Sequence, residues 1–212
     1  VYESKFEGNS SIRFSRLSQD KLVWTTANGC PYEWQSTLIW SVEFLIKIDS
    51  STASDNFGPE FIIAPAAAGL TSLYIWLNGS QRNEINLTIG SKSSLNNSGA
   101  QLSATVPYDQ WAHVYVAHEG GNNVRFYVNG ALIGTRQQTA AWYMNGGLSI
   151  GGQTQAQPTS TNSYLSAQLD DVRIIRGWLP YPEDAGQVAV PVEPLPPGDT
   201  AFVFGKITQL ED

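Results

Sequence analysis

Residues 111–130 read WAHVYVAHEGGNNVRFYVNG, and this stretch decides the fold of the chain. Side chains alternate in character from Trp111 to His118 and again over residues 123–128, which is the period-two pattern of β-strands. Gly-Gly-Asn at 120–122 separates the two runs. Asn129-Gly130 follows, and this dipeptide favours a type I′ turn because both of its central positions need a positive φ. We therefore predict two consecutive hairpins, the second of which continues over residues 131–135.

The same alternation recurs on both sides of this stretch. Between Leu38 and Asp49, six apolar side chains share one face, while Ser41, Glu43, Lys47 and Asp49 share the other. This pattern predicts a long strand with one buried face and one wetter face. Further strands are predicted at residues 11–15, 22–26, 61–64, 73–77, 84–89, 101–105, 148–151 and 165–175. The sequence therefore predicts an all-β fold.

Composition excludes several classes of partner. The 212 residues carry a net charge of −7 with no run of Lys or Arg. The sequence therefore offers no basic patch that could bind the phosphate backbone of a nucleic acid. No apolar stretch reaches the roughly 20 residues that a membrane-spanning helix needs. A single cysteine, Cys30, excludes an intrachain disulfide. We expect neither nucleic acid binding nor membrane insertion.

The character of the sequence changes near its C-terminal end. Residues 1–188 are predicted to form one β-sandwich, and residues 189–200 form a Pro-rich linker because proline cannot donate to a β-ladder. The tail, residues 201–212, contains Phe202, Val203 and Phe204 and is too apolar to remain solvated. We expect this tail either to pack back on the sandwich or to contact neighbouring subunits of a larger assembly.

Residues 111–130 resemble the central hairpins of laminin-G-like domains in the concanavalin A-like lectin/glucanase superfamily. Further motifs follow in the family's order, namely SVEFLIK at 41–47, LSIGG at 148–152 and LDDVRI at 169–174. The resemblance implies a jelly roll of two antiparallel sheets, with ligands on its concave face or rim loops. Residues 171–177 followed by Tyr and Pro are also similar to a strand of bacteriophage virion proteins, which implies an extracellular or virion-surface location.

Members of this superfamily include glycoside hydrolases as well as binding modules, so fold alone does not assign an activity. A retaining glycosidase needs two carboxylates about 5 Å apart. Neither Glu-x-Asp-x-x-Glu nor Glu-x-Asp-x-Glu, the strand patterns of the family's hydrolases, occurs here. Glu43 is about 20 Å along its strand from Asp49. We expect no enzymatic activity, unless Glu43 meets Glu60 or Glu84 from another strand.

Asp170-Asp171 interrupts the alternation of the last long strand. Before the two acids the apolar residues stand at odd-numbered positions, namely Leu165, Ala167 and Leu169, whereas after them they stand at even-numbered positions. A β-bulge, which inserts one extra residue into a strand, would explain this shift. The family resemblance implies a structural Ca²⁺ here, held by Asp170 or Asp171 and by main-chain carbonyls near Gly8. The alternative is a solvated acidic edge.

Three aromatic groups are candidates for ligand binding, because Trp and Tyr rings stack on sugar faces while amides bind hydroxyls. The groups are Tyr32 with Trp34, then Tyr74, Trp76 and Asn78, and finally Trp142, Tyr143 and Asn145. Alternatively, the loop aromatics cap the end of the sandwich or face another subunit.

These observations favour a non-catalytic carbohydrate-binding or adhesion module on an extracellular or virion assembly, with a glycan or cell-surface polysaccharide as its partner. The alternative is a structural or decoration domain that makes subunit contacts without a glycan. A glycoside hydrolase is the least favoured hypothesis.

Overall fold

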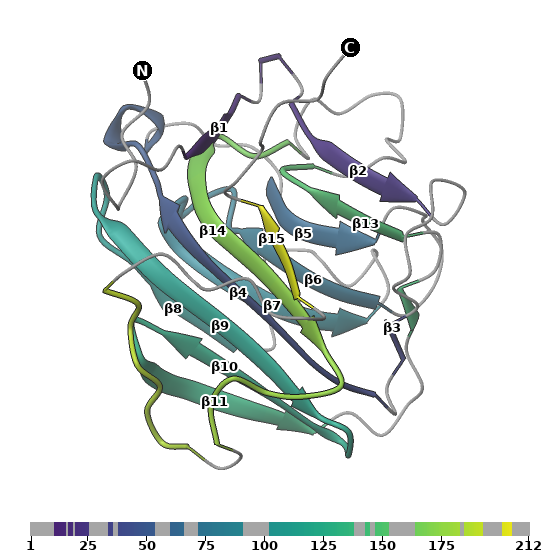
Figure 1. The fold of residues 1–212 in the computed structure, drawn as a ribbon. Helices are drawn as coiled ribbons and strands as arrows, with labels where there is room; N and C mark the ends of the chain where they lie inside the picture. Colours follow the sequence, from purple (N-terminus) through teal and green to yellow (C-terminus); the bar gives the residue numbers. More distant parts are fainter. Residues whose placement is uncertain are drawn as a thin grey trace.

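A computed structural model describes residues 11–15, 17–18, 20–25, 34–35, 38–53, 60–65, 72–90, 102–137, 143–144, 147–152, 164–182, 185–192 and 201–204. These residues are almost entirely β (Figure 1). The elements are β1 (Ile12–Phe14), β2 (Leu22–Thr25), β3 (Trp34–Gln35), β4 (Ile39–Lys47), the 3₁₀ turn η2 (Ser50–Thr52), β5 (Glu60–Pro65), β6 (Ser72–Leu77), β7 (Glu84–Gly90), β8 (Leu102–Thr105), β9 (Trp111–Glu119), β10 (Asn123–Val128), β11 (Ala131–Gln137), β12 (Tyr143–Met144), β13 (Gly147–Ile150), β14 (Ala167–Arg176) and β15 (Ala201–Phe204).

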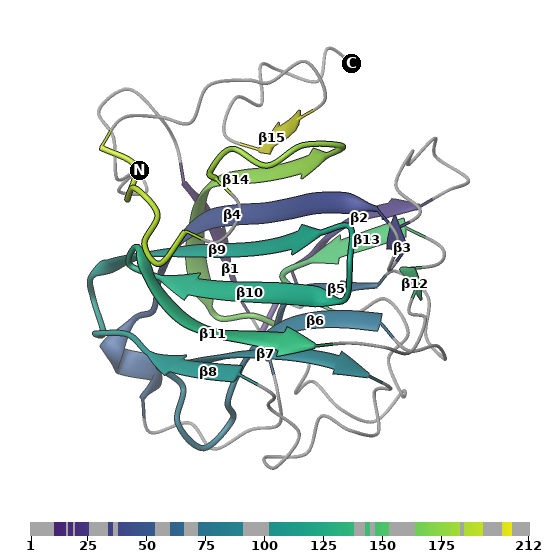
Figure 2. The ribbon, with the colours of Figure 1, turned by 90° about the horizontal axis from the view of Figure 1, so that it is seen from below.

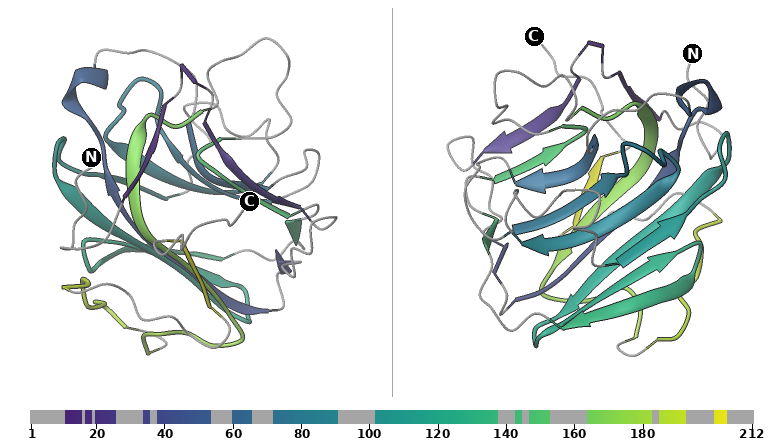
Figure 3. Two further views of the ribbon diagram at one scale, coloured as in Figure 1. Left: turned by 45° about the horizontal axis from the view of Figure 1, so that its top comes forward. Right: turned by 180° about the vertical axis from the view of Figure 1, so that it is seen from behind.

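The strands form two antiparallel sheets that face each other (Figures 2 and 3). The first sheet has the order β1-β14-β4-β9-β10-β11, with β15 also paired to β14. The second has the order β2-β13-β5-β6-β7-β8, and β3 with β12 forms a separate two-stranded ladder. Some neighbours come from distant parts of the sequence, as in a jelly roll: β14 lies between β1 and β4, and β13 lies between β2 and β5. The predicted all-β, two-sheet sandwich is confirmed.

The hairpins predicted from residues 111–130 are present. Strand β9 pairs with β10 and β10 pairs with β11, both antiparallel. Asn129 and Gly130 have φ values of 49° and 80°, which are the positive angles that a two-residue type I′ loop requires. Gly120, in the preceding turn, has a φ of 78°. Local turn chemistry therefore sets the register of three consecutive strands.

The hydrophobic core fills the space between the two sheets. On β4, Trp40, Val42, Phe44 and Ile46 point into it and are at most 1% exposed. Strands β6 and β7 contribute their own alternate residues from the opposite sheet. Burial of apolar area at about 25 cal/mol per Å² makes this layer the main source of stability. The predicted inward face of β4 is confirmed.

The outer face of β4 differs from the expected wetter surface. Ser41 and Glu43 are both 1% exposed, because the chain folds back across this face after β14. We refer to residues 177–192 as the strap. The Tyr127 hydroxyl donates a 2.7 Å hydrogen bond to the Ala185 carbonyl, and the Val188 N–H donates one of 2.9 Å to Gly130. The strap thus buries polar residues that alternation alone assigns to solvent.

Beyond the Pro-rich segment, the backbone of β15 pairs antiparallel with β14, so that Val172 lies opposite Phe204 and Ile175 opposite Ala201. The first part of the tail therefore lies on the chain's own first sheet, which is one of the two expected placements.

Candidate functional site

The short ladder between β3 and β12 brings two of the predicted aromatic groups together. Met144 lies opposite Trp34, and Tyr143 lies opposite Gln35. Strand β12 also contacts β6, which carries the third predicted group. Figure 2 shows β3 and β12 beside each other at one end of the sandwich. Three segments that are far apart in the sequence thus converge, and we call this region the aromatic end.

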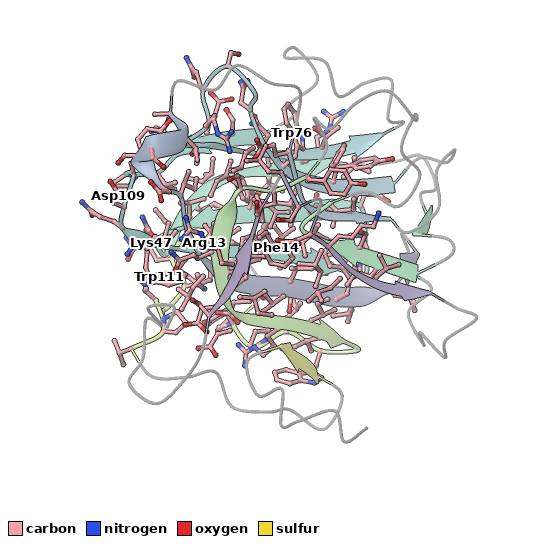
Figure 4. All side chains as sticks on the ribbon, turned by 90° about the horizontal axis from the view of Figure 1, so that it is seen from above. Arg13, Phe14, Lys47, Trp76, Asp109 and Trp111 are labelled. Carbon is pink, nitrogen blue, oxygen red and sulfur yellow. The ribbon has the colours of Figure 1, made fainter. Side chains whose placement is uncertain are left out.

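The outer face of β5 and β6 carries a second apolar cluster, separate from the core. It consists of Phe61, Ala64, Tyr74 and Trp76. The rings of Phe61 and Tyr74 lie 5.6 Å apart between centroids, and the Trp76 indole N–H donates a 3.1 Å hydrogen bond to the Thr88 hydroxyl. The alternate residues of β6 belong to the core, so Tyr74 and Trp76 face the opposite side of the sheet. Figure 4 shows Trp76 well apart from Phe14 of the core. The cluster is therefore on the face of this sheet that points away from the first sheet.

Tyr74 and Trp76 are fully buried in this cluster. Burial raises the pKa of Tyr74 to about 12, so its hydroxyl is protonated at neutral pH. Within the part of the chain that the structure describes, this hydroxyl has no hydrogen-bond partner. A buried polar group without a partner costs about 1–3 kcal/mol, and such groups in native proteins often mark a place where a water or a ligand binds.

Asn78 follows β6 and is used within the turn that joins β6 to β7. Its amide Nδ2 donates a 3.0 Å hydrogen bond to Glu84, and its Oδ1 accepts one of 3.1 Å from the Ser80 N–H. These hydrogen bonds stabilise the turn, which is a structural role that the sequence did not predict for Asn78. A role for Asn78 in ligand binding stays a prediction.

The remaining predicted ligand residues are described in part or not at all. Trp34 and Tyr143 are placed through their backbones in β3 and β12. Tyr32, Trp142 and Asn145 lie outside the described residues, as does Gly8 of the predicted metal site.

The bulge predicted at the two acids of β14 is present. Asp170 lies opposite Leu45 and Arg173 opposite Glu43, so β14 contains one residue more than β4 over this interval. Asp171 has a φ of 46°, a left-handed conformation that Asp tolerates better than most residues. Both acids are 2% exposed, which excludes the solvated acidic edge. The prediction of a β-bulge is confirmed.

The two carboxylates fit a Ca²⁺ site only in part. They are hard oxygen donors, but Ca²⁺ takes six to eight oxygen ligands. The Asp170 carboxylate already accepts a 3.0 Å hydrogen bond from the Asp171 N–H. Among the described residues, no group of three His, Cys, Asp or Glu side chains could hold a metal ion. Further oxygens would have to come from main-chain carbonyls, as the family resemblance implies.

A buried polar cluster lies on the outer face of the first sheet. Glu43 accepts a hydrogen bond from Arg173 Nε at 3.1 Å, and a second one from the same guanidinium. His113 Nε2 lies 2.8 Å from the other carboxylate oxygen, which also accepts a 2.7 Å bond from the Tyr181 hydroxyl of the strap. Burial alone would raise the pKa of Glu43, but His113, Arg173 and Tyr181 together lower it. Glu43 is thus an ionised group that joins three strands to the strap.

Sequence reasoning missed this cluster. The shared outward parity of Glu43 on β4 and His113 on β9 was a usable signal, but it needed the cross-strand register, in which His113 lies opposite Leu45. Arg173 could be placed only after the bulge on β14 was located.

The three glutamates considered for hydrolysis are engaged in separate contacts. Glu43 lies on the outer face of the first sheet, whereas Glu60 and Glu84 belong to the second. Arg82 forms a buried ion pair of 2.7 Å with Glu60. Glu43 therefore does not form the paired carboxylates of a glycosidase with Glu60 or Glu84, which lie in the other sheet. In addition, no helix within the described ranges is long and apolar enough to cross a membrane.

Solved structures with a similar fold include a candidate carbohydrate-binding protein from Bacteroides ovatus, with a TM-score of 0.53 and 13% identity over 78% of this chain and 42% of that one. A mutant of HCR/D gives a TM-score of 0.55 and 13% identity over 84% of this chain and 41% of that one. An alginate lyase from Corynebacterium sp. gives a TM-score of 0.42 and 16% identity over 68% and 62% of the two chains. This chain thus spans about two fifths of the length of the first two proteins. No curated protein matches it.

The first two likenesses show the fold and leave the activity open, because one fold can serve many functions. A family model described as the concanavalin A-like lectin/glucanases superfamily, laminin G type, matches residues 7–182. This range contains the β3–β12 ladder, the bulge of β14 and every strand of the two sheets except β15. The chain therefore belongs to the concanavalin A-like lectin/glucanases superfamily.

Proposed function

We propose that this protein is a non-catalytic carbohydrate-binding module and that its glycan site is the aromatic end. The observation that carries the proposal is the β3–β12 ladder, which brings the Trp34 and Tyr143 segments together beside β6. Aromatic rings stack on the C–H faces of sugars, and a few polar groups then select among hydroxyls.

The arrangement of the acids supports binding rather than hydrolysis. The Glu43 and Glu60 carboxylates are each held by a buried arginine, Arg173 and Arg82 respectively. A carboxylate in that environment is a poor general acid because its ionised form is stabilised. Glu43 and Glu60 are thus held in structural ion pairs.

The experiment is a glycan-array screen of the purified chain, in which the wild type is compared with Trp34→Ala and with Trp178→Ala. Trp178 lies on the strap and is 42% exposed, so the Trp178→Ala variant is a control for the loss of a tryptophan elsewhere on the domain. We expect the Trp34→Ala variant to lose at least tenfold in affinity and the Trp178→Ala variant to bind as the wild type does. Trp76 is unsuitable for this test because it is fully buried and its removal would disturb the fold.

Two results would count against the proposal. Equal binding by both variants would move the site away from the aromatic end. Silence of the correctly folded wild type across a broad array would favour the alternative, a structural or decoration domain that contacts neighbouring subunits.

We also propose that Asp170 and Asp171 contribute carboxylates to a structural Ca²⁺ site, a hypothesis supported by their burial at one bulge. Ligand binding to the folded state raises the melting temperature. We expect excess Ca²⁺ to raise Tm relative to EDTA in the wild type, and we expect no such difference in Asp170→Asn. A wild-type Tm that is identical in Ca²⁺ and in EDTA would contradict the metal site.

We propose that the protein is located on an extracellular or virion surface. This proposal is supported by the similarity of residues 171–177 to virion proteins.

A further inference from the structure

Four residues from four neighbouring strands form a row across the outer face of the first sheet. Gln168 of β14 lies opposite Arg13 of β1 on one side and opposite Lys47 of β4 on the other. Lys47 in turn lies opposite Trp111 of β9. Side chains at directly opposite positions are about 5 Å apart. Figure 4 shows Arg13, Lys47 and Trp111 close together at one edge of the molecule. We call these four residues the cationic row.

Burial of this outer face ends at the cationic row. In the next row along the strands, Leu45 lies opposite Asp170 on one side and His113 on the other, and all three are at most 2% exposed. In the cationic row the Arg13 side chain is 49% exposed, and the other three members are half-buried. A ligand from solvent can therefore reach this row but not the one beside it.

The two cations of the row differ from the arginines inside the sandwich. Arg82, Arg125 and Arg173 are buried in ion pairs with glutamates. Arg13 and Lys47 instead remain accessible, on strands that are separated only by β14. Two strand spacings amount to about 10 Å, so both long side chains can reach one anionic group between them. Because the whole chain carries a net charge of −7, this pair is not part of a generally basic surface.

A hollow of about 20 Å³ lies beside the row and is lined by Arg13, Lys47, Asp49, Thr52, Ser166, Ala167 and Gln168. A cavity of this size holds a group no larger than a water molecule or a single carboxylate oxygen. Asp49 lies 3.5 Å from Arg13, but both side chains are well exposed, and an ion pair of that kind contributes little. The Asp49 carboxylate also accepts a 2.8 Å hydrogen bond from the Ser51 N–H, so Arg13 is not its sole partner.

We propose that the cationic row is a second ligand site, which binds a saccharide that carries a carboxylate. The carboxylate lies between Arg13 and Lys47, where both cations donate charge-assisted hydrogen bonds to it. The adjacent Trp111 indole offers its face to the C–H groups of the sugar ring, and the Gln168 amide can bind a hydroxyl.

This site is separate from the aromatic end. Strand β3 precedes the first residue of β4, whereas Lys47 is the last residue of β4. The nine residues of that strand span about 26 Å at 3.3 Å per residue. The inference therefore goes beyond the proposed glycan site and does not depend on it.

The proposal is tested by calorimetric titration with a panel of uronate oligosaccharides, each paired with its methyl ester. The ester keeps the sugar ring and removes the charge. We expect at least one uronate to bind at least tenfold more tightly than its ester, and its binding to weaken as the salt concentration rises. The double variant Arg13→Gln with Lys47→Gln should lose at least tenfold in affinity for that uronate. Arg136→Gln is the matched control, because it removes an exposed cation from β11 of the same sheet.

Three results would overturn the proposal. These are the absence of binding across the panel, equal affinity for a uronate and its ester, and an equal loss in Arg136→Gln and in the double variant. The melting temperature of each variant verifies that the fold is kept. Trp34→Ala in the same titration should bind the uronate as the wild type does, so that failure of the aromatic end and failure of the cationic row are distinguishable.

Discussion

Replacing Glu43 by alanine is expected to destabilise the fold by about 3–5 kcal/mol, because it leaves the Arg173 guanidinium buried without its carboxylate. Arg173 is 5% exposed and cannot reach water without disturbing β14. The same change removes the acceptor of the Tyr181 hydroxyl and the partner of His113. The strap then loses an anchor on the first sheet. Urea unfolding followed by tryptophan fluorescence measures the free energy of unfolding.

Two comparisons separate the charge from the packing. Tyr181→Phe keeps the ring that packs edge-on against Tyr115, 4.9 Å away, and removes only the hydroxyl, so we expect a loss of about 1–2 kcal/mol. Glu43→Gln keeps the shape of the side chain but not its charge, and should lie between alanine and wild type. A Glu43→Ala variant within 1 kcal/mol of wild type would contradict the buried ionic cluster.

The pH dependence gives an independent check on Glu43. Its pKa is lower in the folded chain than the ordinary value of 4.5, so the unfolded chain binds more protons as the pH falls. The stability that this carboxylate contributes is therefore complete above pH 4.5 and is lost as the pH falls through the folded pKa. We expect the stability difference between the wild type and Glu43→Gln to shrink below pH 4.5.

The second large effect is expected at the Glu60–Arg82 pair of the second sheet. Arg82→Met should cost about 3–5 kcal/mol, because the Glu60 carboxylate, which is 2% exposed, loses the arginine that compensates its charge. The backbone N–H of Ser166 still donates a 3.0 Å hydrogen bond to this carboxylate, but a neutral donor is a weaker partner for a carboxylate than a guanidinium.

A double variant tests the origin of this loss. Glu60→Gln combined with Arg82→Met removes both charges and leaves an amide oxygen to accept the Ser166 N–H. We expect the double variant to be more stable than Arg82→Met alone by 1 kcal/mol or more, which is a coupling energy typical of residues in direct contact. Strictly additive single-variant losses in urea unfolding would show that the two residues do not compensate each other.

Local signals in the sequence predicted the strands and their turns. The alternation between Leu38 and Asp49 predicted the inward face of β4, and Asn129-Gly130 predicted the tight hairpin between β10 and β11. The change of parity at Asp170-Asp171 even located a bulge. Each of these features depends on residues within a few positions of one another, so each can be predicted from a short stretch of sequence.

The burial of the outer faces of the two sheets could not be predicted from such local signals. Glu43 was expected on a wetter face, yet the strap buries it together with His113 and Arg173. Tyr74 and Trp76 were correctly grouped on one side of a strand, but their burial was not expected. Alternation distinguishes the two sides of a strand and does not say what covers the outer one.

The sequence by itself therefore determined the fold class, the hairpins and the residues that could line a glycan site. The tertiary structure alone decided that β12 pairs with β3 beside β6, that the strap covers the first sheet and that β15 closes the edge of β14. The physical reason is distance along the chain. Periodicity and turn propensity act over a few residues, whereas these contacts join segments separated by tens of residues and form only when the two sheets have packed.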